Sequence, residues 1–173
     1  MTEHPSTQTS AVPSVSKFTT SPLRNRLRLE LEAPVAEVWE LMGDLSRFPE
    51  YSAGLERVDV KRGDDGRCAE YTCFFKPVEE GSNGAVSRDV MKWYEPHRGY
   101  LSVEVEGDAG TDGAVALMTL DPTSRGTVVN YEMYFNADDL DAMKAGLDEV
   151  NVDMADRLIG RFGGRVIERF VEK

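Results

Sequence analysis

Leucine alternates with charged residues near the start of the chain. Leu27, Leu29 and Leu31 are separated by arginine and glutamate side chains between positions 26 and 32. A period of two is typical of a strand with one buried and one solvated face. The pattern therefore predicts the first strand of a sheet.

The 22 residues before this pattern have a different character. They are dominated by Ser, Thr and Pro and carry no periodic apolar positions. Such a segment buries too little apolar surface to offset the entropy lost on ordering. We expect a disordered tail over residues 1–22 and one domain over residues 23–173, a length that suits a single hydrophobic core.

Two short helices are predicted after the first strand. Pro34 suits the first turn of a helix, where its missing N–H leaves no hydrogen bond unmade, and apolar residues follow at helical spacing up to Met42. A second helical turn covers residues 45–51 and is interrupted by Pro49. We expect this bent pair to close one end of the sheet.

Six further stretches have the composition of strands, and clusters of turn-forming residues separate several of them. They cover residues 55–61, 67–75, 85–94, 100–106, 114–120 and 127–135. Strands that follow one another so closely predict an antiparallel meander. With the first strand, this gives a sheet of seven strands.

The end of the chain carries a helical pattern. Residues 138–173 contain no proline, and their apolar residues recur every three or four positions, which predicts one long amphipathic helix. The elements fit an α+β fold in which a curved antiparallel sheet wraps around this helix. The two short helices then hold the mouth of the sheet open, so we expect an interior cavity. The helix pattern includes Leu140, Met143, Leu147, Val150, Met154, Leu158, Phe162, Val166 and Phe170.

Charge and composition exclude several classes of partner. The chain has 20 basic and 31 acidic side chains and a net charge of −11, which repels nucleic acids and anionic membrane surfaces. No apolar run approaches the roughly 20 residues that span a bilayer, and the N-terminus lacks the apolar core of a secretory signal. Cys68 and Cys73 are predicted on opposite faces of one strand, too far apart to bridge. We expect a cytoplasmic protein with no nucleic-acid partner and no stable membrane insertion.

The sequence also gives little support for a metal site or a catalytic nucleophile. The chain has two histidines, His4 in the predicted tail and His97 in a predicted turn, and no metal-ligand spacing of Cys, His, Asp and Glu occurs around them. A serine or cysteine nucleophile would need a partner histidine. We therefore expect no metal and no cofactor.

The last predicted strand offers a candidate catalytic residue. Its apolar positions alternate with polar ones, so the apolar set should face the long helix and carry Tyr131 inward with it. The Tyr131 hydroxyl could polarise a ligand carbonyl, or it could simply satisfy a backbone group. Both readings stay open at this point.

The predicted strand 85–94 offers a carboxylate. Placing Arg88 and Lys92 in the interior is the costlier choice, so Asp89, Met91 and Trp93 should face inward. Burial would raise the pKa of Asp89 towards the range of a useful acid or base, while a place at the rim would leave it an ordinary carboxylate. We predict Asp89 and Tyr131 as catalytic. The predicted ligand-binding residues are Phe48, Tyr51, Met91, Trp93, Met118, Met133, Phe135, Met143 and Leu147.

Three groups of residues resemble a known family. Their sequence resembles the START-like or SRPBCC superfamily, in its polyketide cyclase/dehydrase and lipid-transport branch. The resemblance covers about residues 25–173 and implies a helix-grip fold with a hydrophobic pocket. The groups are Ala33-Pro34, Val38-Trp39, Leu41, Asp44, Phe48-Pro49 and Tyr51; then Tyr94-Glu95-Pro96-His97-Arg98; then Gly126-Thr127.

The resemblance implies a pocket and leaves the activity open. One hypothesis is a polyketide aromatase or cyclase of secondary metabolism. Cyclases of the family carry polar or cationic residues along the strand that corresponds to 89–93, and Met91 and Trp93 depart from this. The departure favours a second hypothesis, a carrier or sequestering protein for a lipid, quinone or aromatic metabolite; a third is a partner domain whose acidic surface docks on another protein. The sequence fits a monomer or a homodimer.

Overall fold

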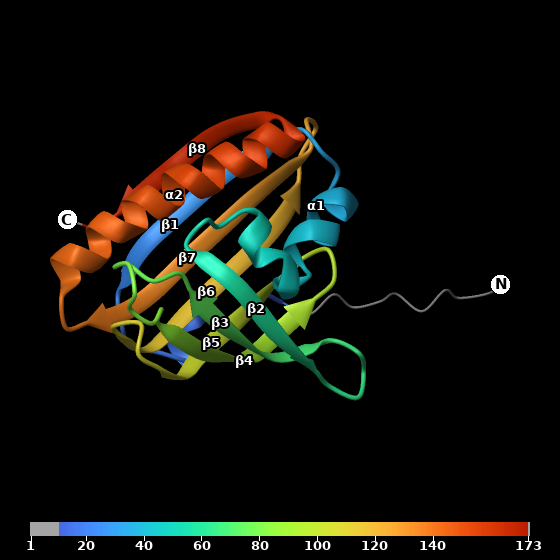
Figure 1. The fold of residues 1–173 in the computed structure, drawn as a ribbon. Helices are drawn as coiled ribbons and strands as arrows, with labels where there is room; N and C mark the ends of the chain where they lie inside the picture. The colour runs from blue at the N-terminus through green and yellow to red at the C-terminus, as the bar shows by residue number, and fades with distance from the viewer. Residues whose placement is uncertain (1–10, 173) are drawn as a thin grey trace.

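The computed structural model describes residues 11–172, which form one curved antiparallel sheet gripping a long helix (Figure 1). All seven expected strands and the two short helices are present, and the helix-grip fold is confirmed. The sheet order is β2-β3-β4-β5-β6-β7-β1-β8. The strands are β1 Leu23–Leu31, β2 Leu55–Arg62, β3 Cys68–Phe75, β4 Val86–Glu95, β5 Gly99–Gly107, β6 Thr111–Pro122, β7 Thr127–Ala137 and β8 Gly164–Val171; the helices are η1 Val15–Lys17, α1 Val35–Met42, η2 Leu45–Glu50 and α2 Leu140–Phe162.

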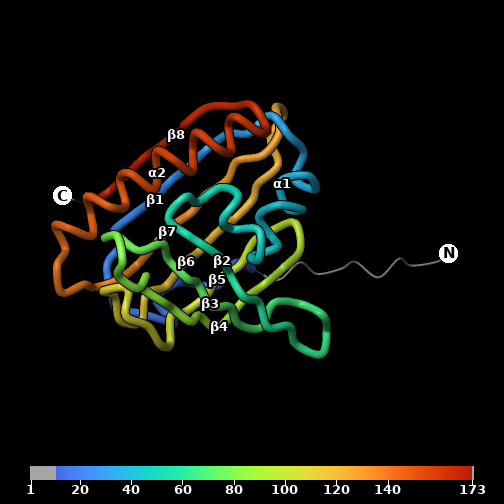
Figure 2. Tube along the Cα trace, viewed as in Figure 1, coloured from blue at the N-terminus to red at the C-terminus, as the bar shows by residue number. Residues whose placement is uncertain are grey.

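The eighth strand corrects the expected helix over residues 138–173. Helix α2 ends at Phe162, and β8 then runs back antiparallel to β1, beside α2 (Figure 2). Gly163 and Gly164 make the reversal with φ of 74° and 131°, a region that side chains disfavour. Val166 and Phe170 fit helical spacing, but a strand accommodates them equally well, so periodicity could not find the break.

The inner face of the sheet supplies most of the core. Leu27, Leu29 and Leu31 of β1 are fully buried, as their alternation predicts. Helices α1 and η2 close one end of the sheet with buried apolar side chains, among them Val38 and Phe48. Burial of each such side chain contributes about 1.5–3 kcal/mol, so this end of the molecule is firmly closed.

A buried amide pair joins α2 to the sheet. Asn25 of β1 and Asn151 of α2 are each about 1% exposed, and each side chain donates to the other's carbonyl oxygen, at 3.2 and 2.6 Å. Because both amides are desolvated, losing one would leave the other unpaired in the core. The pair therefore fixes the position of α2 along β1.

The outer face of the sheet is partly covered by the segment that precedes β1. Val15 and Phe18 pack against a cluster of Leu101, Val115 and Leu117 on β5 and β6. Residues 11–22 thus differ from the disordered tail expected there, because the sheet offers them an apolar surface that the segment alone does not predict. Residues 1–10 of the expected tail lie outside the described residues.

Two further features bear on function. Among residues 11–172, no helix is long and apolar enough to cross a membrane. The same residues contain no group of three or more His, Cys, Asp and Glu side chains arranged to hold a metal ion.

Candidate functional site

Two tyrosines lie in one row across the inner face of the sheet. The register pairs Tyr100 of β5 with Met118 of β6, and Met118 with Tyr131 of β7. Residues paired across neighbouring strands project from the same face. The row therefore confirms that Tyr131 points inward, and it adds Tyr100 on the far side of Met118.

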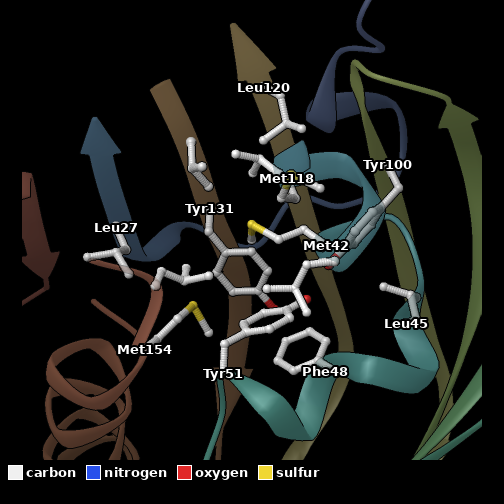
Figure 3. Packing of buried hydrophobic residues seen from close by; sticks show 14 of the residues in the cluster. Leu27, Met42, Leu45, Phe48, Tyr51, Tyr100, Met118, Leu120, Tyr131 and Met154 are labelled. Carbon is white, nitrogen blue, oxygen red and sulfur yellow. The ribbon is translucent and has the colours of Figure 1, made fainter. Parts of the chain in front are cut away.

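A third tyrosine enters this region from the short helices. Tyr51 follows η2, and its ring stacks on Phe48 with 4.9 Å between centroids; Phe48 in turn meets Tyr131 edge-on at 6.3 Å. Figure 3 shows the rings of Tyr51, Tyr100 and Tyr131 reaching into the same part of the interior from different elements. Phe48 and Tyr51, expected to cap the interior, are thus in contact with the predicted catalytic tyrosine.

The hydroxyls of Tyr51 and Tyr100 are unusual. Both side chains are 1% exposed, and neither hydroxyl has a hydrogen-bond partner among the described residues. Burial raises the pKa of all three tyrosines, so they stay protonated at any physiological pH. The interior therefore holds phenolic donors available for an acceptor.

Asp89 also lies on the inner face and is 8% exposed. Its register partner on β5 is Glu104, and the Ser87 hydroxyl donates to its Oδ2 at 3.4 Å. Burial, with a smaller contribution from the negative charge of Glu104, raises the pKa of Asp89 from 3.8 to about 7, against the lowering effect of Ser87. At neutral pH this carboxyl can both accept and release a proton.

Sequence reasoning missed the polar residues of β5. Ser102 accepts or donates a 2.7 Å hydrogen bond with the Tyr71 hydroxyl, and Glu104 accepts from Thr111 at 3.0 Å. Burial also raises the pKa of Glu104. Polar and apolar residues alternate along β5, but here Ser102 and Glu104 face inward, and Leu101 and Val103 lie on the outer face near Phe18. Pattern alone assigns the apolar set to the interior, so the orientation of β5 needed the structure.

Trp93 is not on the inner face, and the prediction that it accompanies Asp89 and Met91 is wrong. Its ring packs against the outer cluster around Leu101 and Leu117, while Met91 packs against the main core. The β4–β5 ladder shifts register between Met91 and Trp93. A bulge of this kind inserts one residue and reverses the alternation that follows it.

Apart from Trp93, the predicted ligand-binding residues divide between two parts of the interior. Met118 lies in the tyrosine row, and Phe48 and Tyr51 lie opposite it. Phe135, Met143 and Leu147 instead form a separate cluster with Ala114, under the first turns of α2. Met133 packs against both clusters, and so the inner face is continuous between them.

Two hollows in the described part of the chain lie away from the tyrosine row. One, of about 460 Å³, is lined by outer-face residues such as Arg88 and Glu106. The other, of about 490 Å³, lies beside the β2–β3 hairpin and is lined in part by Met91 and Tyr94. Side chains occupy the space around the tyrosine row, including Met42, Met118 and Met154, each at most 2% exposed.

The charge of the interior is one-sided. Among the described residues, Asp89 and Glu104 are the buried ionisable side chains of the inner face other than tyrosine and cysteine, and no lysine or arginine is buried. Glu132 is also buried, but it lies on the outer face with Tyr134 and Arg26. Cys68 and Cys73 are both free and buried, and burial raises the pKa of their thiols to about 11 and about 12. The site thus combines carboxyls and phenols and contains no cation.

Comparison with known proteins identifies a family. The family described as polyketide cyclase/dehydrase and lipid transport matches residues 24–173. No curated protein matches the chain. The family match covers almost all of the described domain.

Solved structures show the same fold at low sequence identity. A START superfamily protein from Mycobacterium smegmatis is 14% identical, with a TM-score of 0.67 over 82% of this chain and 97% of its own. The XoxI protein from Bacillus cereus is 12% identical, with a TM-score of 0.62 over 79% and 93%. Ginseng major latex-like protein 151 from Panax ginseng is 14% identical, with a TM-score of 0.54 over 79% and 99%. These similarities establish the fold.

Proposed function

The chain belongs to the polyketide cyclase/dehydrase and lipid transport family, and from this premise we propose that it binds a hydrophobic small molecule between the sheet and α2 and cyclises or dehydrates it. The family and the fold support the hydrophobic ligand. The observation that supports this reaction most directly is the burial of Asp89, which raises the pKa of its carboxyl to about 7 in the same interior as Tyr131.

The proposed reaction needs one acid-base group and one hydrogen-bond donor. Asp89 removes a proton from a carbon next to a ligand carbonyl, while Tyr131 donates a hydrogen bond to the carbonyl oxygen that becomes an enolate. The carbanion carbon attacks a second carbonyl of the same chain, forming a carbon–carbon bond and an alkoxide. Asp89 returns its proton to that alkoxide, which becomes a hydroxyl. The regenerated Asp89 carboxylate then takes a second proton from the carbon between the remaining carbonyl and the hydroxyl-bearing carbon. A carbon–carbon double bond forms, and the carbon–oxygen bond to the hydroxyl breaks as Asp89 delivers this proton to it, so that it leaves as water. The fold contributes by holding a flexible chain bent, so that the two carbonyls meet.

This chemistry sets the other expectations for the protein. Proton transfer and carbonyl polarisation by Asp89 and Tyr131 require no metal and no cofactor. A cytoplasmic location and a monomeric or homodimeric state remain our expectations, with the hydrophobic ligand as the partner and no nucleic acid.

A carrier is the alternative function, and one observation favours it. The space around the tyrosine row is dominated by apolar side chains, among them the flexible, fully buried Met42, Met118 and Met154. Methionine adapts to ligands of varied shape without contributing chemistry. A carrier would use Asp89 and Tyr131 only to orient its cargo.

Extraction of the purified protein separates the two functions. Wild type, Asp89→Asn, Tyr131→Phe and the double variant are extracted with organic solvent, and the bound molecules are identified by mass spectrometry. Tyr134→Phe is the matched control, because Tyr134 lies on β7 but packs on the outer face. We expect the double variant to retain an uncyclised or undehydrated precursor that wild type and the control do not retain. The same stoichiometric compound in all preparations would establish the carrier and overturn the reaction.

A further inference from the structure

Two buried hydroxyls without partners call for a chemical account. Tyr51 and Tyr100 are 1% exposed, and neither hydroxyl has a hydrogen-bond partner among the described residues. An unpaired buried donor is unfavourable, and native proteins contain few of them. The buried Tyr71 avoids this by bonding to Ser102, and the partly buried Tyr94 donates to the Gly43 carbonyl at 2.7 Å.

The two hydroxyls belong to one region of the interior. Tyr100 and Tyr131 stand on either side of Met118, so their backbones are roughly 10 Å apart, two strand spacings. Tyr51 approaches from η2, held against Phe48, which contacts Tyr131. The phenols of Tyr51, Tyr100 and Tyr131 thus reach the same part of the interior, which Met42 and Met118 also occupy (Figure 3).

The surroundings define what these phenols can bind. Burial raises the pKa of all three phenols, so they act as donors and not as phenolates. Asp89 and Glu104 lie on the same face, and no lysine or arginine is buried among the described residues. An anionic carboxylate or phosphate would meet like charge and no counter-ion there. A neutral acceptor oxygen meets the phenolic donors without repulsion between like charges.

We propose that Tyr51, Tyr100 and Tyr131 form a receptor for a carbonyl oxygen, and that the ligand is therefore an uncharged apolar ketone. This inference rests on the proposed function and specifies the ligand of the same site. Ketone binding requires Met42, Met118 and Met154 to move aside, which their unbranched side chains permit. The apolar part of the ketone then fills the space that the three methionine side chains leave.

A pair of probes that differ in one carbonyl tests the proposal. Fluorene and 9-fluorenone have nearly the same shape, and their affinities are measured by titration against wild type, Tyr51→Phe, Tyr100→Phe and Tyr134→Phe. We expect wild type and Tyr134→Phe to bind fluorenone at least about tenfold more tightly than fluorene, the effect of one hydrogen bond. Each interior variant should lose most of this preference while keeping its affinity for fluorene.

The carbonyl stretching band of bound fluorenone provides a second, independent readout. It should lie at lower frequency in wild type than in a hydrocarbon solvent, and should move back in Tyr51→Phe and Tyr100→Phe. Equal affinity for the two probes, with an unshifted band, overturns the carbonyl receptor and leaves the hydrophobic site intact. Failure of both probes to bind contradicts the proposed function itself. Both interior variants should fold, because each removes only an unpaired hydroxyl.

Discussion

Asp89 shows most clearly how the interior changes the protonation of a side chain. It is charged in water, yet its burial on the inner face, and to a smaller extent the negative charge of Glu104, raises its pKa and favours the protonated form. The other titratable groups that interact with it, Tyr71, Cys73 and Tyr131, have raised pKa values and remain neutral. The burial of Asp89 could be predicted from alternation and charge avoidance, whereas the neighbouring Glu104 could not, because β5 turns its polar side inward.

The raised pKa of Asp89 predicts a pH-dependent stability. Between pH 3.8 and about 7 the folded protein holds a proton that the unfolded chain has released. The free energy of unfolding therefore falls as pH rises through this window, by on the order of 4 kcal/mol when the loss is complete. Asp89→Asn removes the effect, so it should match wild type near pH 4 and exceed its stability at pH 8.

Urea denaturation at several pH values measures this difference. Asp121→Asn is the control, because Asp121 is exposed on β6 and its substitution should leave the pH profile of wild type unchanged. A wild-type profile that does not fall between pH 4 and 8 relative to Asp89→Asn contradicts the assignment of the raised pKa.

At the scale of elements, the sequence predicts strands and helices well but fails where the chain breaks its own pattern. The seven expected strands and the α1–η2 pair are present because alternation, proline and turn residues mark them locally. The bulge that turns Trp93 outward and the reversal at Gly163 and Gly164 depend on the neighbouring strands, which local pattern does not reveal. The bulge also explains why Trp93 does not belong to the candidate site.

The reversal into β8 predicts contrasting effects at two glycines. A Cβ at Gly164 would lie 2.0 Å from the Glu30 carbonyl oxygen, and its φ of 131° is already unfavourable for other residues. Gly164→Ala should therefore reduce the free energy of unfolding by roughly 2–4 kcal/mol. Gly160→Ala, in the α2 helix with open space around it, should raise stability by up to about 1 kcal/mol.

Thermal and urea denaturation of the two variants provide the measurement. The comparison is controlled within itself, since both changes add the same methyl group four residues apart. Equal effects of the two substitutions would show that residue 164 is not held in the tight turn into β8.

For the whole molecule, the sheet has two apolar faces, and each has its own cover. The inner face packs on α2 and the short helices, while part of the outer face is covered by Val15 and Phe18. The composition of residues 11–22 gave no sign of this role, since a segment with two apolar anchors acquires structure only from the surface that receives it. Residues 11–22 therefore become ordered only because the folded sheet offers them an apolar surface.

The covered outer face predicts a specific effect of Phe18. Phe18→Ala should lower the free energy of unfolding by about 1–3 kcal/mol and expose part of the cluster around Leu117. Increased fluorescence of an apolar dye in native conditions measures that exposure. Val12→Ala is the control, since Val12 is 39% exposed and should change neither quantity. A variant indistinguishable from wild type would show that the segment does not cover the sheet.

The central claim is that a hydrophobic molecule occupies the space around the tyrosine row, and methionine methyl NMR tests it most directly. The chain has seven methionines, and Met42, Met118 and Met154 lie in the main core, whereas Met91 lines the hollow beside the β2–β3 hairpin. Titration with 9-fluorenone should shift the methyl signals of Met42, Met118 and Met154 together, with the same dissociation constant. Shifts confined to Met91, or no shifts at all, would contradict binding in the interior.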